Sequence, residues 1–166
     1  MDHRKIADLV SLASWEEPTL LFHSPGEVEK DLAEGRAVVI EEGGELVGFC
    51  GWRDLGDWLE LRTVYVAPKF RGQGYAFHLF SEAQRRLELL LPKRKIFLFT
   101  QVPVMKKIIS EWYNFKPANY SVLPWGVWLK IVAHRMHPRR IVSYVKYLKG
   151  LHRLGAWQLF IFERRD

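Results

Sequence analysis

A short segment in the middle of the chain constrains its fold more than any other feature. Residues 58–66 are rich in β-branched and aromatic side chains and indicate a strand, and residues 69–74 follow as a loop with two glycines. The loop opens directly onto a helical pattern that Pro92 ends, with apolar residues at helical spacing: Ala76, Leu79, Phe80, Ala83, Leu87 and Leu90. A buried strand that leads through a short loop into an amphipathic helix predicts a mixed α/β domain.

Periodicity and turn residues predict the remaining elements. Before this segment we expect two helices and a hairpin: a helix from Asp2 to about Ala13, a helix from a Ser24–Glu27 capping box to Gly35, and strands 36–41 and 45–52 joined by Gly43-Gly44. After it we expect a strand at 96–99, a helix at 104–112, an extended stretch at 120–128, a helix at 138–148 and a strand at 157–163. This order predicts an α/β (α+β) fold with a mixed, mostly antiparallel sheet of six or seven strands. Helices should cover both faces, and a helical, basic insertion should precede the last strand.

Composition narrows the class of protein. The 166 residues suffice for one domain over 1–166 with its own core, and 48% hydrophobic with 27% charged residues is typical of a globular chain. No apolar run approaches the roughly 20 residues that span a bilayer, and the amphipathic N-terminus is not that of a signal peptide. Cys50 has no second cysteine to pair with, which favours a reducing, cytoplasmic compartment and a buried packing role. The six histidines show no metal-ligand spacing, so no metal is expected.

The loop at residues 69–74 has the properties of a phosphate site. Its glycines allow the backbone to turn tightly and to approach a ligand closely. The first turn of the following helix offers unpaired N–H groups at the positive end of the helix dipole. Acidic residues are absent from Pro68 to Ser81, whereas Lys69 and Arg71 add positive charge. We therefore expect a phosphate or pyrophosphate here.

The exact pattern selects among known phosphate loops. A Walker loop is excluded because no Gly-Lys-Ser/Thr follows, and a dinucleotide fingerprint fails because Phe77 stands at its third glycine position. What remains is Arg71-x-x-Gly74-x-Ala76, preceded by Val66-x-Pro68. This resembles the signature loop of the GNAT superfamily of acetyl-CoA-dependent N-acetyltransferases. The order of elements is similar to that family from about residue 6 to 116, and residues 117–166 diverge from it.

The resemblance implies a function and a set of site residues. It implies acyl transfer from acetyl-CoA to an amine by direct attack on the thioester. The pyrophosphate would lie on the loop amides, the pantetheine arm would pair along the preceding strand, and an N–H near Val66 would polarise the carbonyl. The residues assigned to CoA in this way are Val64, Tyr65, Val66, Arg71, Gly72, Gln73, Gly74, Tyr75 and Ala76. Glu60, eleven residues before Arg71, is the candidate general base. Alternatively, Glu60 is a solvated strand residue that faces Arg62 or a neighbouring strand.

The chain departs from the family pattern in its second half. Counting back from Asn114-Phe115, which stands where the family has Gly-Phe, places Pro103 at the usual Asn position. Ser110 stands where the family often has a Tyr that protonates the departing thiolate. The family's first strand is also missing or reduced, because a helical pattern begins almost at Met1.

Positive charge is concentrated in the C-terminal third. The net charge is +6, and no Asp or Glu occurs between Trp112 and Phe162, where eight basic residues stand: Lys116, Lys130, Arg135, Arg139, Arg140, Lys146, Lys149 and Arg153. One-sided charge favours an acidic partner, although a solvated basic face accounts for it equally well. Two other functions therefore stay open: a CoA-binding or catalytically silent regulatory module, and a protein that binds nucleic acid or an anionic surface.

Overall fold

The computed structural model of the protein describes residues 1–17, 20, 22–90, 93–136, 138 and 157–163. Contacts divide the chain into two units, an N-terminal unit (residues 1–53 and 61–93) and a C-terminal unit (residues 54–60 and 94–166). Six strands form one sheet in the order β1-β2-β3-β4-β6-β5. Their bounds are β1 Ala37–Glu42, β2 Glu45–Asp54, β3 Trp58–Val66, β4 Lys95–Thr100, β5 Phe115–Ala118 and β6 Gln158–Phe162. The predicted mixed, mostly antiparallel α/β sheet is thereby confirmed, and the single-domain organisation stays a prediction.

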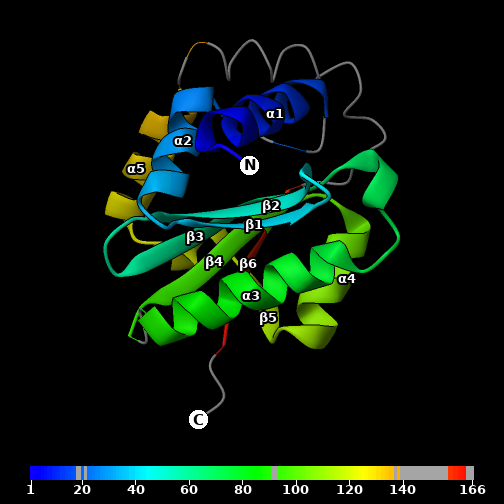
Figure 1. Ribbon diagram of the computed structural model, residues 1–166. Helices are drawn as coiled ribbons and strands as arrows, with labels where there is room; N and C mark the ends of the chain where they lie inside the picture. The colour runs from blue at the N-terminus through cyan, green and yellow to red at the C-terminus, as the bar shows by residue number, and fades with distance from the viewer. Residues whose placement is uncertain (18–19, 21, 91–92, 137, 139–156, 164–166) are drawn as a thin grey trace. The chain divides into compact units, whose positions relative to one another are not determined.

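Two helices pack on one face of the β1–β2 hairpin in the N-terminal unit (Figure 1). These are α1 (His3–Glu16) and α2 (Pro25–Ala33). The predicted capping box is present, because the Ser24 N–H donates to the Glu27 carboxylate at 2.9 Å. Apolar residues of both helices and both strands then share one buried cluster: Ile6, Ala7, Val10, Val28, Ala37, Leu46 and Phe49.

The opposite face of the same hairpin is covered by α3 (Tyr75–Leu90) (Figure 1). The side chains predicted to face the sheet are buried, among them Leu79, Phe80 and Leu87. Gly48 of β2 permits this close approach. A Cβ atom at that position would lie 2.6 Å from Leu79 Cδ1 and 2.8 Å from the Tyr65 carbonyl oxygen. The helix that opens at the candidate loop is therefore fixed directly to the sheet.

The C-terminal unit has its own apolar core. Here β4 pairs in parallel with the start of β3 and antiparallel with β6, which in turn pairs antiparallel with β5. The helix α5 (Trp125–Arg135) packs its buried Val127 and Ile131 against one face of these strands, at Trp58, Phe97 and Leu159. A further helix, α4 (Pro103–Trp112), leads into β5.

One predicted element of this unit is wrong. The stretch 120–128 was expected to be extended, but it contains a 3₁₀ turn at Tyr120–Val122 and the first residues of α5. The physical reason is that Pro124 does not interrupt a strand here: its carbonyl accepts the first helical hydrogen bonds, from Val127 and Trp128. The predicted helix at 138–148, and with it the basic insertion, lies outside the described residues apart from Pro138.

Candidate functional site

The loop between β3 and α3 is ordered by its own hydrogen bonds. A 3₁₀ turn at Pro68–Phe70 follows β3, and the side-chain Nε of Arg71 donates to the Val66 carbonyl oxygen at 3.0 Å. The backbone N–H of Arg71 donates to Pro68 O at 3.3 Å, so its guanidinium and its amide both serve to close the loop. The predicted anion donors thus begin after Arg71.

Two glycines shape the part of the loop that leads into the helix. Gly72 and Gly74 have φ angles of +78° and +86°, in the left-handed region that other residues rarely adopt. The carbonyl of Gly74 accepts from the N–H groups of Phe77 and His78, so that α3 begins immediately after it. The N–H groups of Tyr75 and Ala76 are then in the first turn of a helix, where no intrahelical acceptor exists. This geometry can hold an anion on backbone donors.

The charge around the loop differs from the sequence prediction. The local sequence has no acidic residues, but the fold brings three glutamates to it from elsewhere in the N-terminal unit. Glu45 pairs with Lys69, Glu17 with Arg71, and Glu42 accepts a hydrogen bond from the Tyr75 hydroxyl. That hydrogen bond raises the pKa of Tyr75. Any anion here therefore depends mainly on backbone N–H groups, because both basic side chains already have acidic partners.

The edge of β3 before the loop is only partly paired with its parallel neighbour. The register of β3 with β4 covers Trp58 to Glu60, opposite Lys95 to Phe97. Residues 61–66, which include the predicted CoA-binding Val64, Tyr65 and Val66, lie beyond this register. An extended ligand can pair with backbone groups at such an edge.

Thr63 interrupts the regular geometry of the same stretch. Its φ angle is +52°, although it is a β-branched residue within a strand. Side chains of consecutive strand residues normally point to opposite faces. Here Arg62 and Thr63 both reach the layer formed by α1, α2 and their connection, because Arg62 pairs with Asp31 and Thr63 bonds to His23.

His23 is a buried residue that the sequence analysis missed. Its side-chain Nε2 forms a hydrogen bond with Thr63 Oγ1, and its backbone N–H donates to Ser14 Oγ at 3.0 Å. Ser14 in turn donates to Ser11 O at 2.8 Å within α1. No sequence signal identified His23, since it lies in an irregular connection and its partner is forty residues away.

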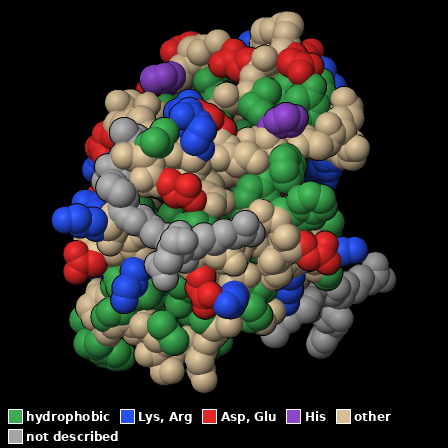
Figure 2. Space-filling model, turned by 90° about the horizontal axis from the view of Figure 1, so that it is seen from below, with side chains coloured by type: hydrophobic (Ala, Val, Ile, Leu, Met, Phe, Trp, Pro, Cys, Tyr) green, Lys and Arg blue, Asp and Glu red, His purple; other side chains and the backbone are tan. Residues whose placement is uncertain are grey.

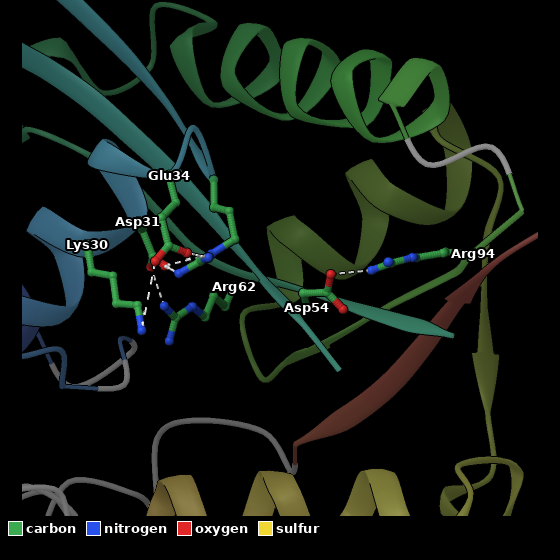
Figure 3. A network of polar contacts seen from close by, with 7 residues as sticks. Lys30, Asp31, Glu34, Asp54, Arg62 and Arg94 are labelled. Atoms are coloured by element: carbon green, nitrogen blue, oxygen red, sulfur yellow. Dashed lines mark hydrogen bonds and ion pairs between the residues drawn. The ribbon is translucent and has the colours of Figure 1, made fainter. Parts of the chain in front are cut away.

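A charged network lies next to this contact. Asp31 of α2 is buried and accepts hydrogen bonds from Arg36, at 3.0 Å and 3.2 Å, and from Arg62 of β3. Figure 3 shows Arg62 pointing toward Asp31, with Lys30 of the same helix and Glu34, the residue that follows the helix, nearby. Two guanidinium groups on one buried carboxylate satisfy its oxygens and tie α2 to the sheet.

Glu60, the predicted base, belongs to the C-terminal unit. Glu60 is buried, with 4% of the residue exposed, so it is not a solvated strand residue. Arg135 of α5 lies 3.7 Å from its Oε1, and the guanidinium carbon of Arg135 stands 4.8 Å over the ring of Phe99. The Arg135 guanidinium therefore fixes the position of the buried Glu60 carboxylate.

The positions that depart from the family pattern lie on α4 and directly after it. Ser110 is exposed on α4, and Pro103 is the first residue of that helix. Asn114, which replaces the family glycine, has a φ angle of +54°, a conformation that asparagine tolerates better than most residues. In the described residues α1 and α2 precede β1, and the prediction that the family's first strand is missing or reduced agrees with that order. The predicted basic surface is outside the described residues at 139–156, so its partner stays a prediction.

Three general findings concern the described part of the chain. No group of three or more histidine, cysteine, aspartate or glutamate side chains in it could hold a metal ion. None of its helices combines the length and the apolar character that crossing a membrane requires. On the face of the molecule in Figure 2, Lys and Arg side chains are interspersed with Asp and Glu.

Comparisons with known proteins agree on one family. A model of the acetyltransferase (GNAT) family matches residues 6–108. The structure of Rv2747 from Mycobacterium tuberculosis, in complex with CoA, has a TM-score of 0.68 at 14% identity and covers 98% of this chain and 96% of that chain. The yncA structure from Salmonella typhimurium, with acetyl-CoA, has a TM-score of 0.62 at 14% identity. The match covers 100% of this chain and 92% of that chain.

A third solved structure is a longer enzyme. N-acetylglutamate synthase from Neisseria gonorrhoeae, complexed with coenzyme A and N-acetyl-glutamate, has a TM-score of 0.65 at 15% identity. The match covers 98% of this chain but 33% of that one. No curated protein sequence matches the chain. At these identities the solved structures establish a shared fold.

Proposed function

Because the chain belongs to the GNAT family of acetyltransferases, we propose that it transfers an acetyl group from acetyl-CoA to an amine acceptor. The observation that carries this proposal is the strand–loop–helix segment at 66–76, in which two left-handed glycines lead into the open first turn of α3. CoA or acetyl-CoA in the structures of similar fold supports the same donor.

In this proposal the donor is held chiefly by backbone. The pyrophosphate lies on the N–H groups from Gly72 to Ala76, at the positive end of α3. The pantetheine arm pairs with the edge of β3 at Val64, Tyr65 and Val66, which lies beyond the register with β4. A backbone N–H near Val66 then donates to the thioester carbonyl and stabilises the negative charge that develops on its oxygen.

The acceptor attacks the thioester carbon as a neutral amine. A lysine-like amine has a pKa of about 10.4, so it must lose a proton before or during attack. Glu60 is the proposed acceptor of that proton, directly or through a water molecule. Its burial and its Arg135 partner fix the carboxylate in place.

The carbon–sulfur bond then breaks and CoA departs as a thiolate. An alkyl thiol has a pKa of about 8.5, so the thiolate is a good leaving group near neutral pH. Protonation by a side chain is therefore less important than for an alkoxide or amine leaving group. This accounts for an exposed Ser110 at the position where the family often has a Tyr.

Release of the CoA thiol from acetyl-CoA in the presence of an amine panel tests the proposal. The panel should include polyamines, free amino acids and peptides with free N-termini. Glu60→Gln should lower kcat by about 10²–10⁴-fold with unchanged affinity for CoA, because a general base contributes on that order. Glu88→Gln, an exposed glutamate on α3 bonded to Gln84, is the matched control and should behave as wild type.

Two results would separate the alternatives. CoA binding without turnover of any amine would indicate a catalytically silent CoA-binding module. Turnover with an unchanged rate and pH profile in Glu60→Gln would assign proton removal to water or to the acceptor itself.

A further inference from the structure

The contact between His23 and Thr63 links a helix connection to the strand on which the donor is proposed to bind. His23 is held on its backbone side by Ser14 and on its ring by Thr63, and His23 and Ser14 are both buried. All three residues belong to the N-terminal unit. The imidazole is therefore a fixed partner for Thr63 Oγ1.

Thr63 needs such a partner because its backbone conformation is unfavourable. A β-branched residue with φ near +52° is a genuine outlier, since its Cβ crowds the neighbouring carbonyl. Conformations of this kind persist only where surrounding structure holds them, and they concentrate at functional sites. The described contact that holds the Thr63 side chain is the His23 ring.

As a consequence, the side chains of the last residues of β3 point to the opposite faces of the sheet from those that regular alternation would give. Arg62 and Thr63 reach the same layer, and Tyr65 then packs against the cluster beneath α1 and α2. If side chains alternated regularly after Arg62, Val64 would face the layer of α1 and α2, in the position that Tyr65 occupies. A one-residue slip moves every following side chain, and with it every N–H group, to the other side of the strand.

We propose that His23 is a positioning residue for acyl transfer: through Thr63 it holds the left-handed turn in β3 that aims the backbone of residues 64–66 at the acyl donor. This inference rests on the proposed function, because residues 64–66 are the donor-binding edge. His23 takes no part in moving protons in this account. Its role is to fix the geometry of a strand on which it does not itself lie.

A matched pair of substitutions at residue 63 tests the role. Thr63→Val and Thr63→Gly both remove the hydroxyl and leave His23 without that bond, but glycine adopts a positive φ angle without steric cost. Thr63→Val should lose kcat by about 10²-fold, the size expected when reacting groups are misplaced by about 1 Å. The kcat of Thr63→Gly and of Thr63→Ser should stay within a few-fold of wild type. Glycine keeps the positive φ angle without a contact to His23, and serine keeps the hydroxyl that bonds to His23.

Substitutions of His23 test the same contact. His23→Leu should lower kcat as Thr63→Val does, and adding Thr63→Gly to His23→Leu should restore it. His23→Gln, which can present a hydrogen-bonding group at a similar reach, should retain most of the activity. Affinity for CoA should change less than tenfold in all variants that fold, because the pyrophosphate site on the loop is not altered.

Crystal structures of the Thr63→Val and Thr63→Gly variants give a readout that does not depend on activity. We expect a positive φ angle at residue 63 in wild type and Thr63→Gly, and an extended one in Thr63→Val. The role of His23 is overturned if Thr63→Val keeps the left-handed turn, or if Thr63→Val and Thr63→Gly are equally impaired in an active enzyme. A wild-type protein that binds no CoA would instead contradict the proposed function.

Discussion

At the scale of single residues, burial determines what Cys50 can do. Cys50 lies within β2 with no exposed surface, and burial raises the pKa of its thiol to about 12. The thiolate is the reactive form of cysteine, so a thiol with this pKa is almost entirely protonated at neutral pH. This agrees with the packing role expected for it and leaves no nucleophile at this position.

We therefore predict that Cys50 reacts with a thiol reagent such as 5,5′-dithiobis(2-nitrobenzoate) only when the protein opens. At pH 8 the native protein should release little thionitrobenzoate over hours, whereas the protein in denaturing guanidinium should react within minutes. Labelling across a denaturant series should follow unfolding measured by tryptophan fluorescence. Rapid, complete labelling of the native protein would contradict the burial of this side chain.

The partners of Glu60 and His23 could not be predicted from the sequence. Glu60 was chosen by its distance from Arg71, but its ion-pair partner Arg135 is far along the chain and could not be inferred from local pattern. The contact between His23 and Thr63 was missed for the same reason. Pairings between residues distant in sequence arise from the tertiary fold, and a single sequence carries no direct record of them.

At the scale of elements, the approach of α3 to the sheet depends on one position without a side chain. Gly48 of β2 faces Leu79 of α3 and the Tyr65 carbonyl. The carbonyl belongs to the backbone of β3 next to the candidate loop, and it cannot move without displacing that strand. The packing of α3 and the geometry of the proposed donor-binding edge are therefore coupled.

Gly48→Ala should destabilise the protein by about 1–3 kcal/mol, because a methyl group is forced into a filled space. Gly26→Ala is the matched control: Gly26 is in α2, nothing lies within 4 Å of its Cβ position, and alanine should be neutral or stabilising there by up to about 1 kcal/mol. Urea unfolding followed by circular dichroism measures both. Equal stabilities of the two variants would contradict the close approach of α3 to β2.

Elements with strong local patterns were predictable, and those set by context were not. The strand at 58–66 was predicted to stop at Ala67-Pro68, the helix after the loop followed from the helical spacing of its apolar residues, and the described bounds agree with both. The helix at Trp125–Arg135 was missed because Pro124 and Gly126 resemble breakers of a strand, although proline is equally suited to precede a helix. The short β5 was not expected, since its four residues form a strand only by pairing with β6.

At the scale of the whole molecule, charge is distributed differently from what the linear sequence suggests. Residues 68–81, the loop and the first part of α3, include no acidic residue, yet Glu17, Glu42 and Glu45 contact their side chains. Basic and acidic side chains are also mixed on the face in Figure 2. In the proposed donor site, the phosphates therefore depend mainly on the backbone geometry of the loop, and attraction to lysine or arginine side chains contributes less.

Calorimetric titration of CoA into wild type, Gly72→Asp and Gly35→Asp tests whether the loop backbone binds the donor. Both glycines have left-handed φ angles, +78° and +67°, and no atom within 4 Å of the Cβ position, so the two variants carry similar backbone strain and the same added charge. Gly35 follows α2, whereas Gly72 is in the loop. We predict that Gly35→Asp binds CoA as wild type does, and that Gly72→Asp loses at least tenfold, about 1.4 kcal/mol. Equal CoA affinity in all three folded proteins would contradict the assignment of the loop as the donor site.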